Sequence, residues 1–169
     1  ATHPQKYFRI HQYKSPHNAQ IHYTTTGPEI WKQTGGQIDV FVSTLGTTGT
    51  VMGAGQFLRE KNPNIRIVSV EPTPQNKQQG IRNVEVQRTP KIWDESMVNE
   101  RMVSEDGDAF SLARALALQE GIFAGISSGS ALWGAIEQAK RLEKGTVVVL
   151  LPDGGEKYLS TSLFGEESE

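Results

Sequence analysis

Short apolar runs alternate along the chain with stretches whose apolar residues recur every three or four positions. The short runs predict strands at 7–13, 38–43, 65–70, 101–104 and 146–151. The longer stretches predict helices at 24–33, 50–60, 108–120 and 130–142. Strands that alternate with helices are typical of a parallel sheet covered by helices on both faces. The pattern therefore predicts an α/β fold of three layers with a mostly parallel sheet.

Turn and cap residues refine this outline. The helix at 24–33 is expected to take Thr26 as its N-cap, with Pro28 in its first turn. Residues 72–100 hold three prolines and a polar run, which indicates a long surface loop with at most one short helix. The turn at 152–155 is expected to lead into a last short helix.

The turn between the strand at 38–43 and the helix at 50–60 is built almost entirely of glycine and threonine. Its residues are Gly46, Thr47, Thr48, Gly49 and Thr50. Glycines let a backbone approach a ligand closely, and the amides at a helix N-terminus attract anions, above all phosphate. The turn lacks the Gly-Lys-Ser/Thr of a P-loop and the spacing of the dinucleotide fingerprint. On this stretch alone, a tight turn without a ligand is the alternative.

Two more polar turns follow apolar segments, GISSGS at 125–130 and PDGGEKY at 152–158. Ligands of parallel α/β sheets gather at the carboxyl ends of the strands, so all three turns are expected to line one crevice. Ser127 and Asp153 are the side chains of interest in the two later turns. For each of them, capping of a helix is the simpler alternative.

Composition narrows the function classes. The 169 residues suit one domain, and 17 basic against 19 acidic residues give no argument for nucleic acid or a membrane surface. No apolar run approaches the ~20 residues of a membrane span, and the polar first residues do not resemble a signal peptide. Without cysteine, disulfides and thiolate sites are excluded, and we expect a cytoplasmic protein. The four histidines, His3, His11, His17 and His22, lack the spacing of a zinc site. We therefore expect no metal site, and we expect these histidines to be exposed.

Four stretches together resemble the PLP (pyridoxal 5'-phosphate)-dependent cysteine synthases, the O-acetylserine sulfhydrylase group, which is related to cystathionine β-synthase. They are HYTTTGPEIWKQTGG (22–36), STLGTTGTVMG (43–53), EGIFAGISSGSA (120–131) and LPDGGEKYLSTSLF (151–164). The doubled threonine of the loop and the GIR at 80–82 are more similar to the B-type enzyme. The resemblance implies the large domain of a fold-type II PLP enzyme, similar to the tryptophan synthase β-subunit, and a homodimer. It also implies replacement of the acetoxy group of O-acetylserine by sulfide or another sulfur donor, giving L-cysteine and acetate.

The resemblance assigns roles by position. It implies that the turn at 46–50 holds the PLP phosphate and that Ser127 bonds the pyridine nitrogen. A serine there leaves the ring a weaker electron sink than an aspartate would, which suits elimination better than transamination. Gln12 corresponds to a glutamine that contacts the substrate carboxylate, although the sequence departs from the family in the following residues, Lys14 to His17. Arg82 is expected at the mouth of the site or, alternatively, as a solvated loop arginine, and Asp153 in the cleft.

The family's N-terminal half carries the Schiff-base lysine and a Ser/Asn-rich loop that grips the substrate carboxylate. Neither motif occurs among these residues, and none of the nine lysines has the expected setting. Residues 1–169 are therefore expected to form a C-terminal PLP-phosphate-binding domain, without a catalytic residue of its own and inactive alone. The alternatives are a cystathionine β-synthase-like or other PLP-dependent β-replacing or eliminating enzyme, and a non-catalytic binding module.

Overall fold

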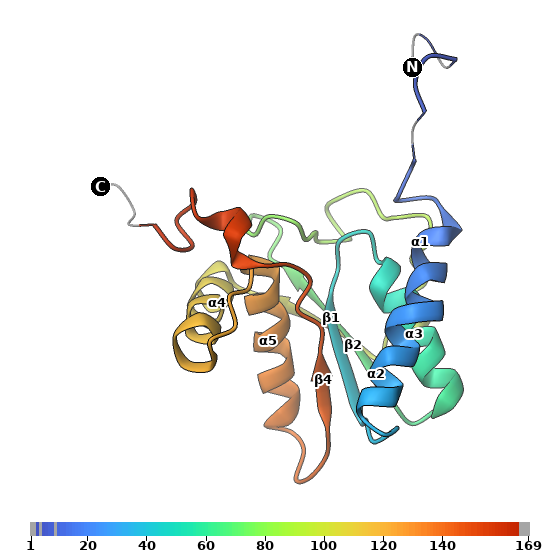
Figure 1. Cartoon of the computed structure of the whole chain (residues 1–169), viewed down its shortest axis with the longest axis vertical. Helices are drawn as coiled ribbons and strands as arrows, with labels where there is room; N and C mark the ends of the chain where they lie inside the picture. Colours follow the sequence, from blue (N-terminus) through green and yellow to red (C-terminus); the bar gives the residue numbers. More distant parts are fainter. Residues whose placement is uncertain (1–2, 4, 9, 166–169) are drawn as a thin grey trace.

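The computed structural model describes residues 3, 5–8 and 10–165. Its centre is a sheet of four parallel strands, in the order β3-β2-β1-β4 (Figure 1). The strands are β1 (Val40–Thr44), β2 (Arg66–Pro72), β3 (Glu100–Ser104) and β4 (Val147–Val149). Because every pair is parallel, the carboxyl ends of all four strands lie at one edge of the sheet. The predicted parallel sheet is confirmed.

Helices cover both faces of the sheet, as predicted (Figure 1). One face carries α1 (Pro16–Ile21), the π-helical turn η1 (His22–Thr26), α2 (Gly27–Gln33) and α3 (Gly49–Lys61). The other face carries α4 (Asp106–Glu120) and α5 (Ile126–Ala139). Two short 3-10 turns complete the chain, η2 (Glu95–Met97) and η3 (Gly155–Tyr158). Within the described residues, no helix has both the length and the apolar character needed to cross a membrane.

The alternation of side chains along β1 divides the core into two layers. Phe41 points toward the α3 side and packs in a cluster with Leu58 and Ile67. Val40 and Val42 belong to a second cluster on the α5 side. A Cβ at Gly134 of α5 would overlap Val70, so a glycine there lets α5 approach the sheet closely. All five residues of β1 are buried, which explains its continuous apolar pattern.

The strand predicted at 7–13 is wrong for the described part of that range, which excludes residue 9. These residues form no strand, and the side chains of Tyr7, Phe8 and Ile10 are 64%, 93% and 76% exposed. Apolar alternation makes a strand only when a neighbouring strand pairs with its backbone, and none of the sheet's strands lies beside this segment.

Two helices begin earlier than predicted. The helix expected at 24–33 continues back through η1 to Pro16, so Thr26 has helical φ/ψ and lies inside it rather than capping it. Proline at the first helical position gives the true start, after an extended Ser15. The helix predicted at 130–142 begins at Ile126, directly after the extended Gly125, so the serines of the GISSGS turn lie in its first turns.

Candidate functional site

The glycine–threonine turn joins the end of β1 to the start of α3, as predicted. Thr48 has a left-handed backbone (φ 70°, ψ −3°), which is uncommon for a β-branched residue. Gly49 then begins the helix, and a Cβ at this position would overlap the Asn18 carboxamide. The turn therefore depends on a glycine at 49 and on a strained threonine at 48, a combination that tends to occur at functional sites.

The polar groups of this turn are not fully satisfied within the protein. The Thr48 side chain is buried, and its Oγ1 has no hydrogen-bond partner. No side chain caps α3, and the Gly49 amide makes only a long contact of 3.4 Å to Thr47 Oγ1. Buried polar atoms without a partner are costly, and an anion at a helix N-terminus satisfies such donors. The turn therefore fits a phosphate group such as that of PLP, and we call residues 46–50 the phosphate cradle.

The cradle opens into a cavity of about 240 Å³. Its walls come from the ends of β1 and β4, the cradle, the loop after β2 and the start of α5. The lining residues are Ser43, Thr44, Gly46, Thr47, Thr48, Thr50, Gly80, Ile81, Ser127, Leu150, Pro152 and Asp153. All three polar turns contribute to this lining, which confirms the prediction that they share one crevice. No lysine is among these described lining residues.

Ser127 and Asp153 face each other across the cavity wall. Ser127 Oγ donates a long hydrogen bond of 3.4 Å to Asp153 Oδ1, and Tyr158 OH donates to Asp153 Oδ2 at 2.8 Å. Burial, together with this carboxylate, raises the pKa of Tyr158, so the phenol stays a donor. Gly125 and Gly154 occupy the N-cap positions of α5 and η3. Neither Ser127 nor Asp153 is therefore a cap residue, and both side chains are available to the cavity.

His22 is a site residue that the sequence reasoning missed, because it was expected to be exposed. Its ring is half-buried against α3, with Nε2 at 3.3 Å from Thr50 Oγ1 and Nδ1 at 3.0 Å from Thr26 Oγ1. Burial lowers the pKa of His22 below its ordinary value of 6.5. A histidine one helical turn before a threonine was the available signal, but only the packing on α3 shows which residues it meets.

Gln12 and Arg82 lie together, in a second pocket of about 430 Å³. The pocket is lined by His11, Gln12, Tyr13, Lys14, Arg82, Arg88, Thr89, Pro90 and Lys91, a set with several basic residues and no acidic one. The Arg82 guanidinium lies over the Tyr13 ring at 4.5 Å and donates to the Arg88 carbonyl at 3.0 Å. Gln12 and Arg82 thus line the same pocket, and neither of them lines the cradle cavity. The two residues before Arg82, Gly80 and Ile81, line the cradle cavity instead.

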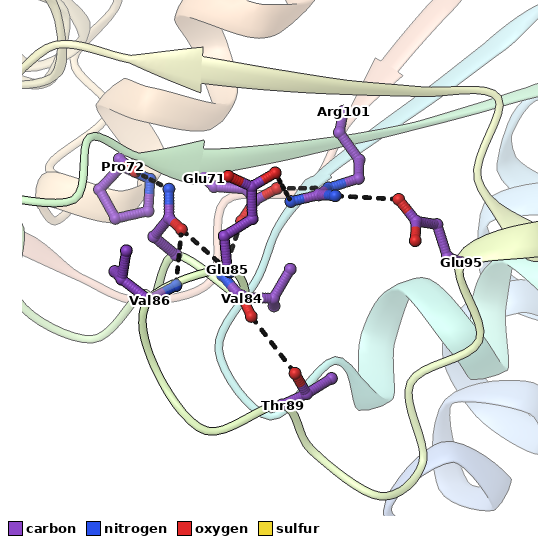
Figure 2. A network of polar contacts seen from close by, with 9 residues as sticks. Glu71, Pro72, Val84, Glu85, Val86, Thr89, Glu95 and Arg101 are labelled. Carbon is purple, nitrogen blue, oxygen red and sulfur yellow. Dashed lines mark hydrogen bonds and ion pairs between the residues drawn. The ribbon is translucent and has the colours of Figure 1, made fainter.

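A buried ion pair anchors the loop that carries Arg82 (Figure 2). The Glu71 side chain is 1% exposed and accepts from Arg101 Nε at 2.6 Å and from the Val84 amide at 2.8 Å. Arg101 also pairs with Glu95 at 2.9 Å and with Glu85 at 3.3 Å (Figure 2). Hydrogen bonding to Glu71 raises the pKa of Arg101. The network ties the middle of the long loop, at Val84 and Glu85, and its last part, at Glu95, to β2 and β3. No pattern in the sequence predicts it.

Candidate metal ligands do not cluster in the described part of the chain, where no group of three His, Cys, Asp or Glu side chains converges. The site is therefore best described by its anion-binding turn, its cavity and the Ser127–Asp153 pair.

Known proteins match this chain in both sequence and fold. The cysteine synthase of Aquifex aeolicus (strain VF5) is 44% identical over 169 residues, which cover 97% of this chain and 52% of that protein. Cysteine synthase B of Escherichia coli (strain K12) is 45% identical over 158 residues, covering 94% of this chain and 52% of that protein. The crystal structure of a cysteine synthase from Entamoeba histolytica has a TM-score of 0.91 at 35% identity, over 99% of this chain and 52% of that chain.

The chain thus spans about half the length of the curated relatives it matches. Residues 1–153 match the family described as pyridoxal-phosphate dependent enzyme. That match covers much more than half of the 169 residues and includes every part of the cradle cavity. The chain therefore belongs to the pyridoxal-phosphate dependent enzyme family.

Proposed function

We propose that this chain supplies the phosphate-binding part of a cysteine synthase. The complete enzyme replaces the acetoxy group of O-acetylserine with sulfide, giving L-cysteine and acetate. The observation that carries the proposal is the buried, unpartnered Thr48 hydroxyl beside the uncapped start of α3. An anion bound inside the cavity of about 240 Å³ would satisfy both groups.

The residues divide the work by position. The amides of the cradle and the hydroxyls of Thr48 and Thr50 bind the phosphate of PLP. Ser127 donates its hydroxyl proton to the pyridine nitrogen from the other side of the cavity, in place of its long bond of 3.4 Å to Asp153. When bound, PLP supplies an electron-withdrawing ring that acidifies the Cα proton of the amino acid and lets its β-substituent leave. A neutral serine at the nitrogen keeps this withdrawal moderate, which suits β-replacement.

The second pocket receives the substrate's anionic end. Gln12 donates to the α-carboxylate, and Arg82 adds a positive charge at the mouth of the site. The lysine that anchors PLP comes from outside these 169 residues, because the described cavity lining holds none. The complete enzyme is a homodimer.

Reduction with borohydride tests the cofactor part of the proposal. The chain is incubated with PLP, reduced and mapped by peptide mass spectrometry. Since no lysine lines the described cavity, only scattered and substoichiometric labelling of surface lysines is expected. One stoichiometrically labelled lysine, with sulfide-dependent formation of cysteine, would show that the chain carries its own anchor.

A chimera tests the reaction. This chain replaces the matching half of the Escherichia coli cysteine synthase B, and the fusion is assayed with O-acetylserine and sulfide. We expect cysteine formation, and loss of PLP from a fusion that also carries Gly49→Val, because that side chain would overlap Asn18. A PLP-loaded fusion that makes cystathionine from serine and homocysteine but no cysteine from O-acetylserine would favour the cystathionine β-synthase-like alternative.

A further inference from the structure

The helical segment 16–33 is packed unusually closely onto α3. A Cβ at Gly53 would overlap the Ala19 carbonyl and lie 2.8 Å from the Cβ of His22. Because position 53 has no side chain, His22 is held against the first turns of α3, within 3.3 Å of Thr50 Oγ1. The contact occurs at a π-helical turn, His22–Thr26, and single π-helical turns are frequent at functional sites.

The imidazole lies between two hydroxyls, and their hydrogen bonds are interdependent. A neutral imidazole has one N–H donor and one nitrogen acceptor. If Thr26 donates to Nδ1, the ring proton is on Nε2, and Nε2 donates to Thr50 Oγ1. The Thr50 proton is then free to point into the cradle cavity, which Thr50 lines. In the opposite tautomer Thr50 donates to Nε2 and turns its lone pairs toward the anion, which is repulsive.

A comparison of three neighbouring threonines indicates that the Thr26 hydroxyl sets the tautomer of the His22 ring. Thr24 and Thr25 donate to main-chain carbonyls of the preceding helical turn. Thr26 instead has the His22 ring as its only side-chain partner among the described contacts. Burial lowers the pKa of His22, so the ring is neutral near pH 7. The tautomer of the neutral ring then decides whether the Thr50 hydroxyl turns its proton or its lone pairs toward the cavity.

We propose that His22 is a positioning residue which, with its tautomer set by Thr26, turns the Thr50 hydroxyl into a donor toward phosphate in the cradle. The proposal rests on the phosphate-binding function proposed above and names the residues that orient the hydroxyl of Thr50. His22 does not itself touch the phosphate.

Inorganic phosphate titrated into the 169-residue chain at pH 8 tests this relay. Nitrogen-15 NMR of the His22 ring reports which nitrogen carries the proton, and the amide of Gly49 reports phosphate affinity. In the phosphate-bound chain we expect the proton on Nε2. His22→Leu weakens phosphate binding about tenfold and Thr26→Val about threefold, since each loses an ordered hydrogen bond to the anion. His22→Gln, which retains an N–H donor toward Thr50, stays within about twofold of the wild type.

Thr25→Val is the matched control, because it makes the same substitution one residue earlier and removes only a bond to the Ile21 carbonyl. It should leave phosphate affinity unchanged. A bound state with the proton on Nδ1, wild-type affinity in His22→Leu, or equal weakening in His22→Gln and His22→Leu would each overturn the role of His22. If His22→Leu does not fold, the ring nitrogens and Thr26→Val decide the question. A wild-type chain that binds no phosphate would instead overturn the proposed phosphate site itself.

Discussion

Two buried polar groups lie near the carboxyl edge of the sheet, and they differ in how their hydrogen bonds are met. At the end of β2, each carboxylate oxygen of Glu71 has a protein partner, Arg101 for Oε1 and the Val84 amide for Oε2. After β1, the Thr48 hydroxyl has none. A fully satisfied buried network holds the fold together, whereas an unsatisfied buried group at a cavity is available to a ligand.

This difference assigns separate tasks to neighbouring parts of one edge. The Glu71–Arg101 pair fixes the loop that brings Gly80 and Ile81 to the cavity wall. The cradle is held in place by its glycines and by the packing of α3, and its Thr48 hydroxyl has no partner within the protein. Substitutions in the first region should therefore change stability, and substitutions in the second should change binding.

The largest expected effect is on stability. Arg101→Met leaves Glu71 buried without its charged partner and should lower the free energy of unfolding by about 3–5 kcal/mol, measured by denaturant titration. Adding Glu71→Gln should recover part of the loss, because the buried charge is then removed while the acceptor for Val84 remains.

Arg66→Met is the control for that prediction. Arg66 pairs with Glu100 at 3.0 Å, but its side chain is 41% exposed, so its loss should cost under about 1 kcal/mol. Equal losses in Arg66→Met and Arg101→Met would contradict the structural role given to the buried pair.

The second effect is expected on phosphate binding rather than on stability. Thr48→Val keeps the shape and β-branching of the side chain and removes only the unpartnered hydroxyl. Calorimetry should show phosphate affinity falling about tenfold, the value of one hydrogen bond to a charged group. The free energy of unfolding should stay constant or rise by up to about 1 kcal/mol, because a buried unsatisfied group is lost. A large loss of stability with unchanged phosphate affinity would make Thr48 a structural residue.

The smallest effect separates two parts of the cavity. Ser127→Ala should weaken PLP binding about threefold, because one hydrogen bond to the ring is lost, and leave inorganic phosphate binding unchanged. Parallel titrations with PLP and with phosphate measure the two affinities. Equal affinities of wild type and Ser127→Ala for PLP would remove Ser127 from the ring site.

The glycine–threonine turn and the sheet were predictable because both follow from the local sequence pattern. A β-branched strand, a glycine-rich turn and a helical period identify the 38–60 region without any knowledge of the remainder. The shared crevice followed from the parallel topology, since parallel strands bring the turns after them to one edge.

Features that depend on tertiary contact were not predictable. Residues 16–23 lack a clear apolar period and are followed by three β-branched threonines. They form a helix because they pack on the glycines of α3. The ion pair of Glu71 with Arg101 joins residues 30 positions apart, and the contact of His22 with Thr50 joins residues 28 positions apart. The alternation at 7–13 was misleading because, in the described part of that range, no strand of the sheet pairs with it.

The most direct test of the central claim is a three-way NMR titration of the chain with PLP, inorganic phosphate and pyridoxal, which lacks the phosphate. The account predicts that PLP and phosphate shift the amides of residues 46–50, and that pyridoxal at the same concentration does not. Shifts confined to the basic pocket around Arg82, or equal effects of PLP and pyridoxal on the cradle, would contradict the claim that residues 46–50 bind phosphate.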